Sequence, residues 1–136
     1  ARVAKRQELE EAVEQRTSVL TALVESGTLA SVREVIVVDE AVSTQDEVRE
    51  RLRTGSREGL LVVALRQTGG RGRFGRPWQD TGEQGVAASL ALPGELARDG
   101  TLPIAMGVAL CRTAETALDV SPPPTAPPQA VISFSP

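Results

Sequence analysis

The sequence predicts a mixed α/β (α+β) domain in which helices flank a small sheet. Three observations support this class. Two apolar runs at 35–38 and 60–65 have the length and composition of buried strands. The segment between them has helical features, and a third apolar run follows at 86–92. The last predicted element is a helix at 102–118. This order of elements is typical of a mixed sheet with helices packed on it.

The first predicted element is an amphipathic helix over residues 3–25, which Gly27 would end. Its apolar residues recur at near-helical spacing: Leu9, Val13, Leu20 and Val24. Residues 1–30 are therefore assigned to an N-terminal helix, either packed on its own domain or available to a partner.

The predicted helix after the first strand begins at a polar segment, Ser43-Thr44-Gln45-Asp46-Glu47. Thr44 and Glu47 predict a capping box, in which each side chain bonds the backbone N–H of the other end. Val48 and Leu52 continue the apolar face as far as Gly55.

The last predicted helix starts at Thr101 as the cap, with Pro103 near its first position. Its apolar face would be Ile104, Val108, Cys111 and Leu118. Cys111 is the one cysteine, so no disulfide can form within the chain, and it is expected to be a small buried residue. Residues 31–119 would form the domain, and 120–136 a disordered tail, because 121–129 hold five prolines.

Charge is distributed unevenly along the chain. The net charge is −3, which argues against a general polyanion-binding protein. Residues 66–76 nevertheless hold four arginines and no acid. No apolar run is long enough to span a bilayer and no signal peptide is evident, so a cytoplasmic location is expected, with no membrane partner.

The glycine–arginine stretch after the second strand predicts an anion-binding loop. Its glycines let the backbone approach a ligand, and its arginines supply bidentate donors for carboxylate or phosphate. Gln67 can both donate and accept hydrogen bonds, and Trp78 offers a flat ring. The stretch lacks the Gly-Lys-Ser/Thr ending of a P-loop, and no helix follows the glycines as in a Rossmann fingerprint. A disordered RNA-binding segment is an alternative, although nucleic acid is the less favoured partner.

Two motifs resemble biotin–protein ligases of the biotinyl/lipoyl ligase superfamily. Residues 67–78, Gln-Thr-Gly-Gly-Arg-Gly-Arg-Phe-Gly-Arg-Pro-Trp, resemble the ligand loop of that family. Residues 39–45, Asp-Glu-Ala-Val-Ser-Thr-Gln, resemble its Ser-Thr-Asn/Gln element at a strand–helix junction. The resemblance covers about residues 33–118. It implies part of a mixed sheet like that of class II synthetases.

The resemblance also implies a reaction and a set of site residues. Biotin and ATP would give biotinyl-5′-AMP, and the biotinyl group would then pass to a lysine of a biotin carboxyl carrier domain. Arg73 would be the catalytic stabiliser of developing negative charge. The implied biotin-binding residues are Ser43, Thr44, Gln45, Gln67, Arg71, Gly72 and Arg73. The implied nucleotide-binding residues are Arg73, Arg76 and Trp78, and Gly70, Gly72 and Gly75 would let the loop close over the intermediate.

Other features of the sequence limit this interpretation. Magnesium is expected for the family, but no metal ligand is identified here. Lys5 is the only lysine, so the two family lysines that follow the last predicted helix have no counterpart, and a truncated, catalytically impaired domain is expected. Homodimerisation, or a partner bound at an exposed sheet edge or the first helix, is also possible. The alternatives left open are a non-catalytic biotin- or nucleotide-binding or interaction module, and a relative that handles lipoate or octanoate.

Overall fold

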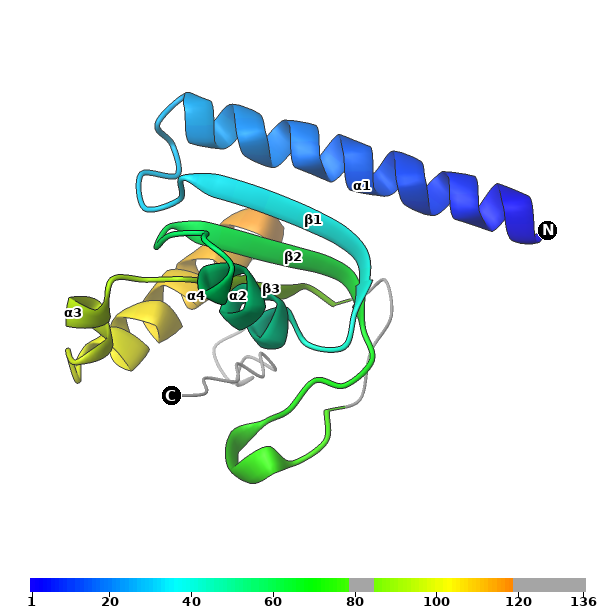
Figure 1. The fold of residues 1–136 in the computed structure, drawn as a ribbon. Coiled ribbons are helices and arrows are strands. Elements are labelled where there is room, and N and C mark those ends of the chain that lie inside the picture. Colours follow the sequence, from blue (N-terminus) through cyan, green and yellow to red (C-terminus); the bar gives the residue numbers. More distant parts are fainter. Residues whose placement is uncertain (79–84, 119–136) are drawn as a thin grey trace. The chain divides into compact units, whose positions relative to one another are not determined.

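The computed structural model describes residues 1–78 and 85–118, and it divides into two compact units, Ala1–Pro93 and Gly94–Pro136 (Figure 1). The predicted tail at 120–136 and the end of the predicted loop at 79–84 lie outside the described residues. The first unit contains the sheet and the second contains helices.

The first unit is built on a three-stranded mixed sheet, which confirms the predicted class. Strands β1 (Glu34–Ala41) and β2 (Leu60–Gln67) run parallel, with Glu34 opposite Leu60 and Ala41 opposite Gln67. Parallel neighbours need a crossover, and helix α2 (Thr44–Arg53) supplies it. Strand β3 (Ala87–Leu90) pairs antiparallel with β2, so the order is β1-β2-β3.

The core lies between the central strand and α2. Leu60 and Val62 are fully buried and Ala64 nearly so, which marks one face of β2 as the core face. Val48 of α2 packs on this face in one cluster with Leu60, Val62 and Ala91. The predicted strands and the helix between them are therefore confirmed, with β1 longer than the four-residue apolar run.

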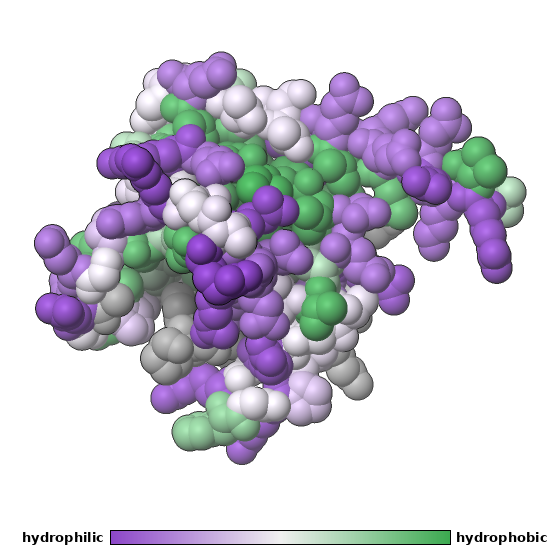
Figure 2. Space-filling model, viewed as in Figure 1, coloured by the Kyte–Doolittle hydropathy of each residue, from purple (hydrophilic) through white to green (hydrophobic). Residues whose placement is uncertain are grey.

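Helix α1 (Arg2–Glu25) packs along β1 by a stripe of half-buried residues (Figure 1). None of its residues is fully buried. The half-buried positions are Leu9, Ala12, Val13, Thr17, Leu20, Leu23 and Val24. The predicted apolar face thus packs on the helix's own domain, which is one of the two predicted alternatives; the other was a helix available to a partner. In the same view, hydrophobic residues gather along β1 and hydrophilic ones cover much of α1 (Figure 2).

The predicted capping box at the start of α2 is wrong. The N-cap residue is Ser43, in extended conformation, and no side-chain hydrogen bond caps the helix. The Glu47 N–H is instead satisfied by the Ser43 carbonyl, at 3.1 Å. Asp46 and Glu47 in the first turn and Arg51 and Arg53 in the last still favour the helix dipole.

The second unit contains a short helix α3 (Gly94–Ala97), which the sequence did not predict, and α4 (Leu102–Leu118), which it did. The Thr101 N–H and hydroxyl both donate to Asp99 Oδ1, at 2.9 and 2.7 Å, just before α4. Cys111 is exposed, so the expectation of a buried thiol is wrong. Two helices without a sheet in the described part of this unit offer little interior to enclose it. No helix in residues 1–78 and 85–118 has the length and apolarity to cross a membrane.

Candidate functional site

The predicted site elements meet at the carboxyl ends of the two parallel strands. Strand β1 ends at Ala41 and β2 at Gln67, which are opposite each other in the register. The pairing continues past both strand ends, because the Thr68 N–H donates to Ala41 O at 3.0 Å and the Gly69 N–H donates to Val42 O at 2.7 Å. Ligands of open α/β sheets bind at this edge, outside the carboxyl ends of the strands.

The centre of the site is a set of three polar side chains that we call the polar hub: Thr44, Gln67 and Ser89. The Thr44 backbone N–H donates to Gln67 Oε1 at 2.9 Å, and the Thr44 hydroxyl donates to the same oxygen at 3.3 Å. A backbone N–H can only donate, so it determines which way the Gln67 amide points. Both acceptor positions of Oε1 are occupied, and the amide nitrogen faces away from Thr44.

The polar hub therefore changes the role expected of Gln67. A free glutamine would both donate and accept, whereas this side chain has only N–H donors left for a ligand. Within the described residues, the Gln67 amide nitrogen makes no hydrogen bond.

Ser89 is the member of the polar hub that sequence reasoning missed. It lies in β3 opposite Val62, so the two side chains share the sheet face that packs on α2. Its hydroxyl oxygen is 2.8 Å from that of Thr44, the first residue of α2. A serine inside a short apolar strand gives no signal of its own, because only the register of β3 brings it to the site.

The loop after β2 forms a hairpin, here called the arginine hairpin and comprising residues 70–78. An isolated bridge joins Arg71 to Pro77. The Gly72 N–H donates to Arg76 O at 2.8 Å and the Trp78 N–H donates to Gly70 O at 2.9 Å. The described part of the predicted loop is thus hydrogen-bonded, unlike the disordered segment of the RNA-binding alternative.

The tip of the hairpin has unusual backbone angles. A 3-10 turn covers Arg73–Gly75, in which Phe74 adopts φ 61° and Gly75 φ 70°. The left-handed region is costly for a bulky residue, by about 1–3 kcal/mol. Phe74 is also 90% exposed, and Arg73 Cζ lies 5.8 Å from its ring centroid. A strained, exposed aromatic residue next to a cation is more typical of a ligand-binding segment than of a structural turn.

Two glycines of the loop lie close to neighbouring side chains. A Cβ atom at Gly70 would collide with the Gln67 amide nitrogen and lie 3.3 Å from Trp78 Cβ. One at Gly69 would lie 2.6 Å from Val42 Cγ1. At Gly72 the nearest atoms would be 3.7 Å away, which is ordinary contact. Gly70 therefore lets Gln67 and the hairpin pack together, and Gly72 has no such constraint.

The arginines of the hairpin are held in different ways. Arg71 Nη2 contacts both carboxylate oxygens of Asp46, at 2.6 and 2.8 Å, which ties the hairpin to the first turn of α2. Arg49 lies 3.6 Å from the same carboxylate. Among the described residues, Arg73 and Arg76 form no ion pair, and both are exposed. Two guanidinium groups are thus available to an anion, and a third is held by Asp46.

The other predicted site residues lie around the polar hub and the hairpin. Ser43 is buried, and its hydroxyl makes no hydrogen bond to a described residue. Gln45 is half-buried in the first turn of α2. The Trp78 side chain lies against Gly70 and Gly72 and is 39% exposed. Hydroxyls, an amide and an indole ring are thus gathered beside the arginines.

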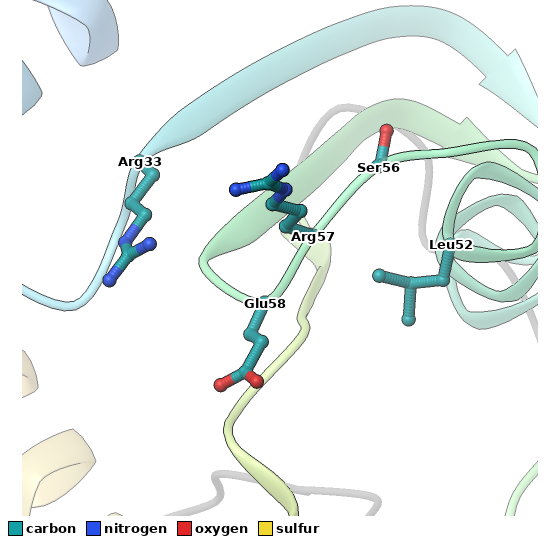
Figure 3. A pocket seen from close by; sticks show the side chains of 5 residues that line it. All are labelled: Arg33, Leu52, Ser56, Arg57 and Glu58. Carbon is teal, nitrogen blue, oxygen red and sulfur yellow. The ribbon is translucent and has the colours of Figure 1, made fainter.

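A surface pocket at the opposite end of the strands is a weaker candidate. It is lined by Arg33, Leu52, Ser56, Arg57 and Glu58, which precede β1 and β2 or end α2. Figure 3 shows the Arg57 side chain extending toward Arg33, with the Glu58 carboxylate directed elsewhere. This pocket lies at the amino ends of the parallel strands, and none of the predicted site residues lines it.

The fit of a magnesium ion can be judged from the carboxylates. The described residues contain no group of three or more His, Cys, Asp or Glu side chains that could hold a metal ion. Asp46, the acid that the hairpin contacts, is already engaged by Arg71. Among the described residues, side chains alone therefore form no magnesium cage.

The fold and the site define a mixed α/β ligand-binding domain with a polar hub and an arginine hairpin at one sheet edge. The chain belongs to the biotin/lipoate A/B protein ligase family, whose sequence model matches residues 37–131. The match begins within β1 and includes both motifs. Members join an acyl group to a protein, in general a carrier protein. A search of curated protein sequences found no match to this chain.

Proposed function

We propose that this chain binds biotin and its adenylate, as the ligand-binding part of an ATP-dependent biotin–protein ligase. The observation that carries the proposal is the polar hub next to the arginine hairpin. Gln67 presents N–H donors and Ser43 a hydroxyl, and Arg73 and Arg76 present charge a few residues further along. A ligand that spans both parts would combine a polar neutral end with an anionic end.

Biotin fits this combination better than lipoate or octanoate. The ureido ring of biotin has a carbonyl acceptor and two N–H donors, whereas a dithiolane ring or an alkyl chain has none. Burying polar side chains against an apolar ligand would leave their hydrogen bonds unmade, at a cost of about 1–3 kcal/mol for each group. The hydroxyl of Ser43 and the amide nitrogen of Gln67, which bond no described residue, thus favour a ligand with hydrogen-bonding groups.

The proposed reaction has two steps. A carboxylate oxygen of biotin attacks the α-phosphorus of ATP, an acyl–O–P bond forms, and the bond to the departing pyrophosphate breaks. A neutral lysine amine of the carrier protein then attacks the acyl carbon, AMP leaves, and the nitrogen loses a proton. Negative charge is concentrated on the phosphate oxygens in the first step, and fixed guanidinium groups stabilise it without reorganisation.

Each part of the hairpin has a role in this proposal. Arg73 lies at the tip and stabilises the α-phosphate charge. Arg71 exchanges its Asp46 partner for the ligand carboxylate or phosphate, and Trp78 offers its exposed ring to the adenine. Closure of the hairpin over the mixed anhydride would exclude water, which would otherwise hydrolyse it.

Ligand binding is the property that the polar hub and the arginine hairpin support directly in this chain. All the positive charge in the hairpin comes from arginines, and Lys5 lies in α1. Pyrophosphate release from biotin and ATP, followed by labelling of a carrier domain, measures turnover directly. Robust release would contradict the expectation of an impaired enzyme without contradicting the binding site.

Isothermal titration calorimetry tests the binding proposal. The ligands are biotin, lipoate, octanoate and a stable biotinyl adenylate analogue in which a sulfamate replaces the phosphate. We expect biotin and its analogue to bind and the other two acids to bind more weakly. Arg73→Ala should reduce the affinity for the adenylate analogue about 10- to 100-fold, which is the range for a lost hydrogen bond to a charged group. Arg57→Ala is the matched control, because it removes an exposed arginine at the opposite strand ends.

Two results would overturn this function. Preferential binding of lipoate or octanoate would place the chain with the other branch of the family. Equal effects of Arg73→Ala and Arg57→Ala would show that the hairpin is not the anion site.

A further inference from the structure

We infer that Ser89 of β3 is a positioning residue that determines the ligand specificity of Gln67. Its hydroxyl, through Thr44, holds the Gln67 amide so that only N–H donors face the ligand. The group of the ligand that meets Gln67 must then be a hydrogen-bond acceptor, such as the ureido carbonyl of biotin. This inference rests on the proposed function for the identity of the ligand, but not for the geometry.

The argument starts from the hydrogens available to the polar hub. Thr44 has one hydroxyl hydrogen, and the bond to Gln67 Oε1 uses it. The 2.8 Å contact between Thr44 Oγ1 and Ser89 Oγ is then satisfied only when Ser89 donates. The arrangement that satisfies both contacts at once therefore runs from Ser89 to Thr44 to Gln67, because a Thr44 hydrogen directed to Ser89 would leave the Oε1 contact unmade.

The consequence for Gln67 follows from its amide group, which carries an acceptor oxygen and a donor nitrogen. Without the Ser89 donor, the Thr44 hydroxyl loses the partner that polarises and orients it, which weakens its 3.3 Å bond to Oε1. The amide is then held mainly by the bond from the Thr44 N–H and gains freedom to rotate. A side chain that rotates presents oxygen and nitrogen in turn, and it discriminates poorly between donors and acceptors on the ligand.

Gly70 supports the same orientation from the other side. The Gln67 amide nitrogen lies so close over Gly70 that a Cβ atom there would collide with it. The amide is thus enclosed between the Thr44 donors and the Gly70 backbone. The residues that hold this arrangement come from α2, β3 and the hairpin.

The test compares two substitutions at Ser89 with a matched control. Ser89→Ala removes the hydroxyl, Ser89→Thr retains it, and Ser56→Ala removes a half-buried serine hydroxyl at the opposite strand ends. Titration with biotin should show affinity reduced about five- to tenfold in Ser89→Ala, roughly the value of one lost hydrogen bond. Ser89→Thr and Ser56→Ala should stay within about twofold of the unsubstituted chain.

A ligand change tests the direction of the bonds. In a biotin analogue whose carbonyl is replaced by a protonated imine, the acceptor becomes a donor that faces the N–H donors of Gln67. We expect the unsubstituted chain to bind biotin more tightly than this analogue. In Ser89→Ala, the ratio of the two affinities should be smaller by about fivefold or more. Equal preference in the unsubstituted chain and in Ser89→Ala would overturn the inference.

A ligand-free measurement separates this inference from the proposed function. Hydrogen exchange of the Thr44 backbone amide, followed by NMR, should be several-fold faster in Ser89→Ala than in Ser56→Ala. Unchanged exchange and an unchanged Gln67 side-chain amide signal would overturn the inference. Faster exchange in a chain that does not bind biotin would uphold the positioning role and reject the proposed function instead.

Discussion

Replacing Gly70 with alanine should disconnect the arginine hairpin from the polar hub. A Cβ atom at this position would collide with the Gln67 amide nitrogen and lie 3.3 Å from Trp78 Cβ. Gln67 is held on its other side by Thr44, so it cannot retreat without losing hydrogen bonds. The glycine is required here by close approach and not by its backbone angles, since Gly70 is absent from the positive-φ residues.

The expected cost can be worked from these contacts. Moving Gln67 breaks two bonds, of 2.9 and 3.3 Å, each contributing about 1 kcal/mol net. Thr44 is only 3% exposed, so its backbone N–H would lose its partner in a place where little water can replace it. We therefore expect the free energy of unfolding to fall by about 2–3 kcal/mol, and biotin affinity to fall about tenfold.

Urea denaturation followed by circular dichroism measures the change, with Gly72→Ala as the matched control. Gly72 has φ −82° and ψ −171°, and a Cβ atom there would meet its nearest neighbours at 3.7 Å. This control should be neutral or stabilising by up to about 1 kcal/mol, because alanine restricts the unfolded chain. Equal midpoints for the two variants would refute the reasoning.

A double-mutant cycle identifies the cause of the loss. If the clash with Gln67 dominates, Gly70→Ala should cost much less in a Gln67→Ala background, where that side chain is gone. An unchanged cost would instead assign the effect to Trp78 or to the hairpin backbone.

Three further perturbations test other parts of the structure. Asp46→Asn should release Arg71 from its ion pair and tighten binding of the sulfamate analogue a few-fold at low salt. Weaker binding would show that Asp46 helps to position the hairpin. Leu60→Ala should lower the free energy of unfolding by about 2–4 kcal/mol in urea denaturation, because Leu60 is fully buried in the core; a loss under 1 kcal/mol would contradict that burial. The bonds from Thr101 lower the pKa of Asp99 in the folded chain. The stabilisation that they give to the start of α4 is therefore fully present above the ordinary pKa of an aspartate carboxyl. It is lost as the pH falls through the lowered pKa of Asp99. Amide chemical shifts of the first turn of α4 should report this loss on acidification, and Asp99→Asn should weaken the pH dependence.

Local patterns in the sequence were sufficient to predict the three strands and the helices α1, α2 and α4. The apolar runs predicted β1 and β2 because buried strands need apolar side chains, and the spacing of Leu9, Val13, Leu20 and Val24 predicted α1 because the helical repeat places them on one face. The chemistry of the glycines and arginines after β2 predicted an anion-binding loop there, and the structure shows that its described part is a hairpin. The family match to residues 37–131 is consistent with the resemblance seen in the two motifs, although the choice between biotin and lipoate remains a proposal.

Partners that are distant in the sequence could be assigned only from the tertiary structure. Thr44 was predicted to cap its own helix, but its N–H and hydroxyl bond Gln67, 23 residues away, and its hydroxyl contacts Ser89, 45 residues away. Arg71 was assigned to the ligand and is held by Asp46. A short-range pattern constrains the backbone of one element. The register of β3 against β2 and the crossover through α2 determine which side chains meet, and so only the folded chain shows that Gln67 is a donor.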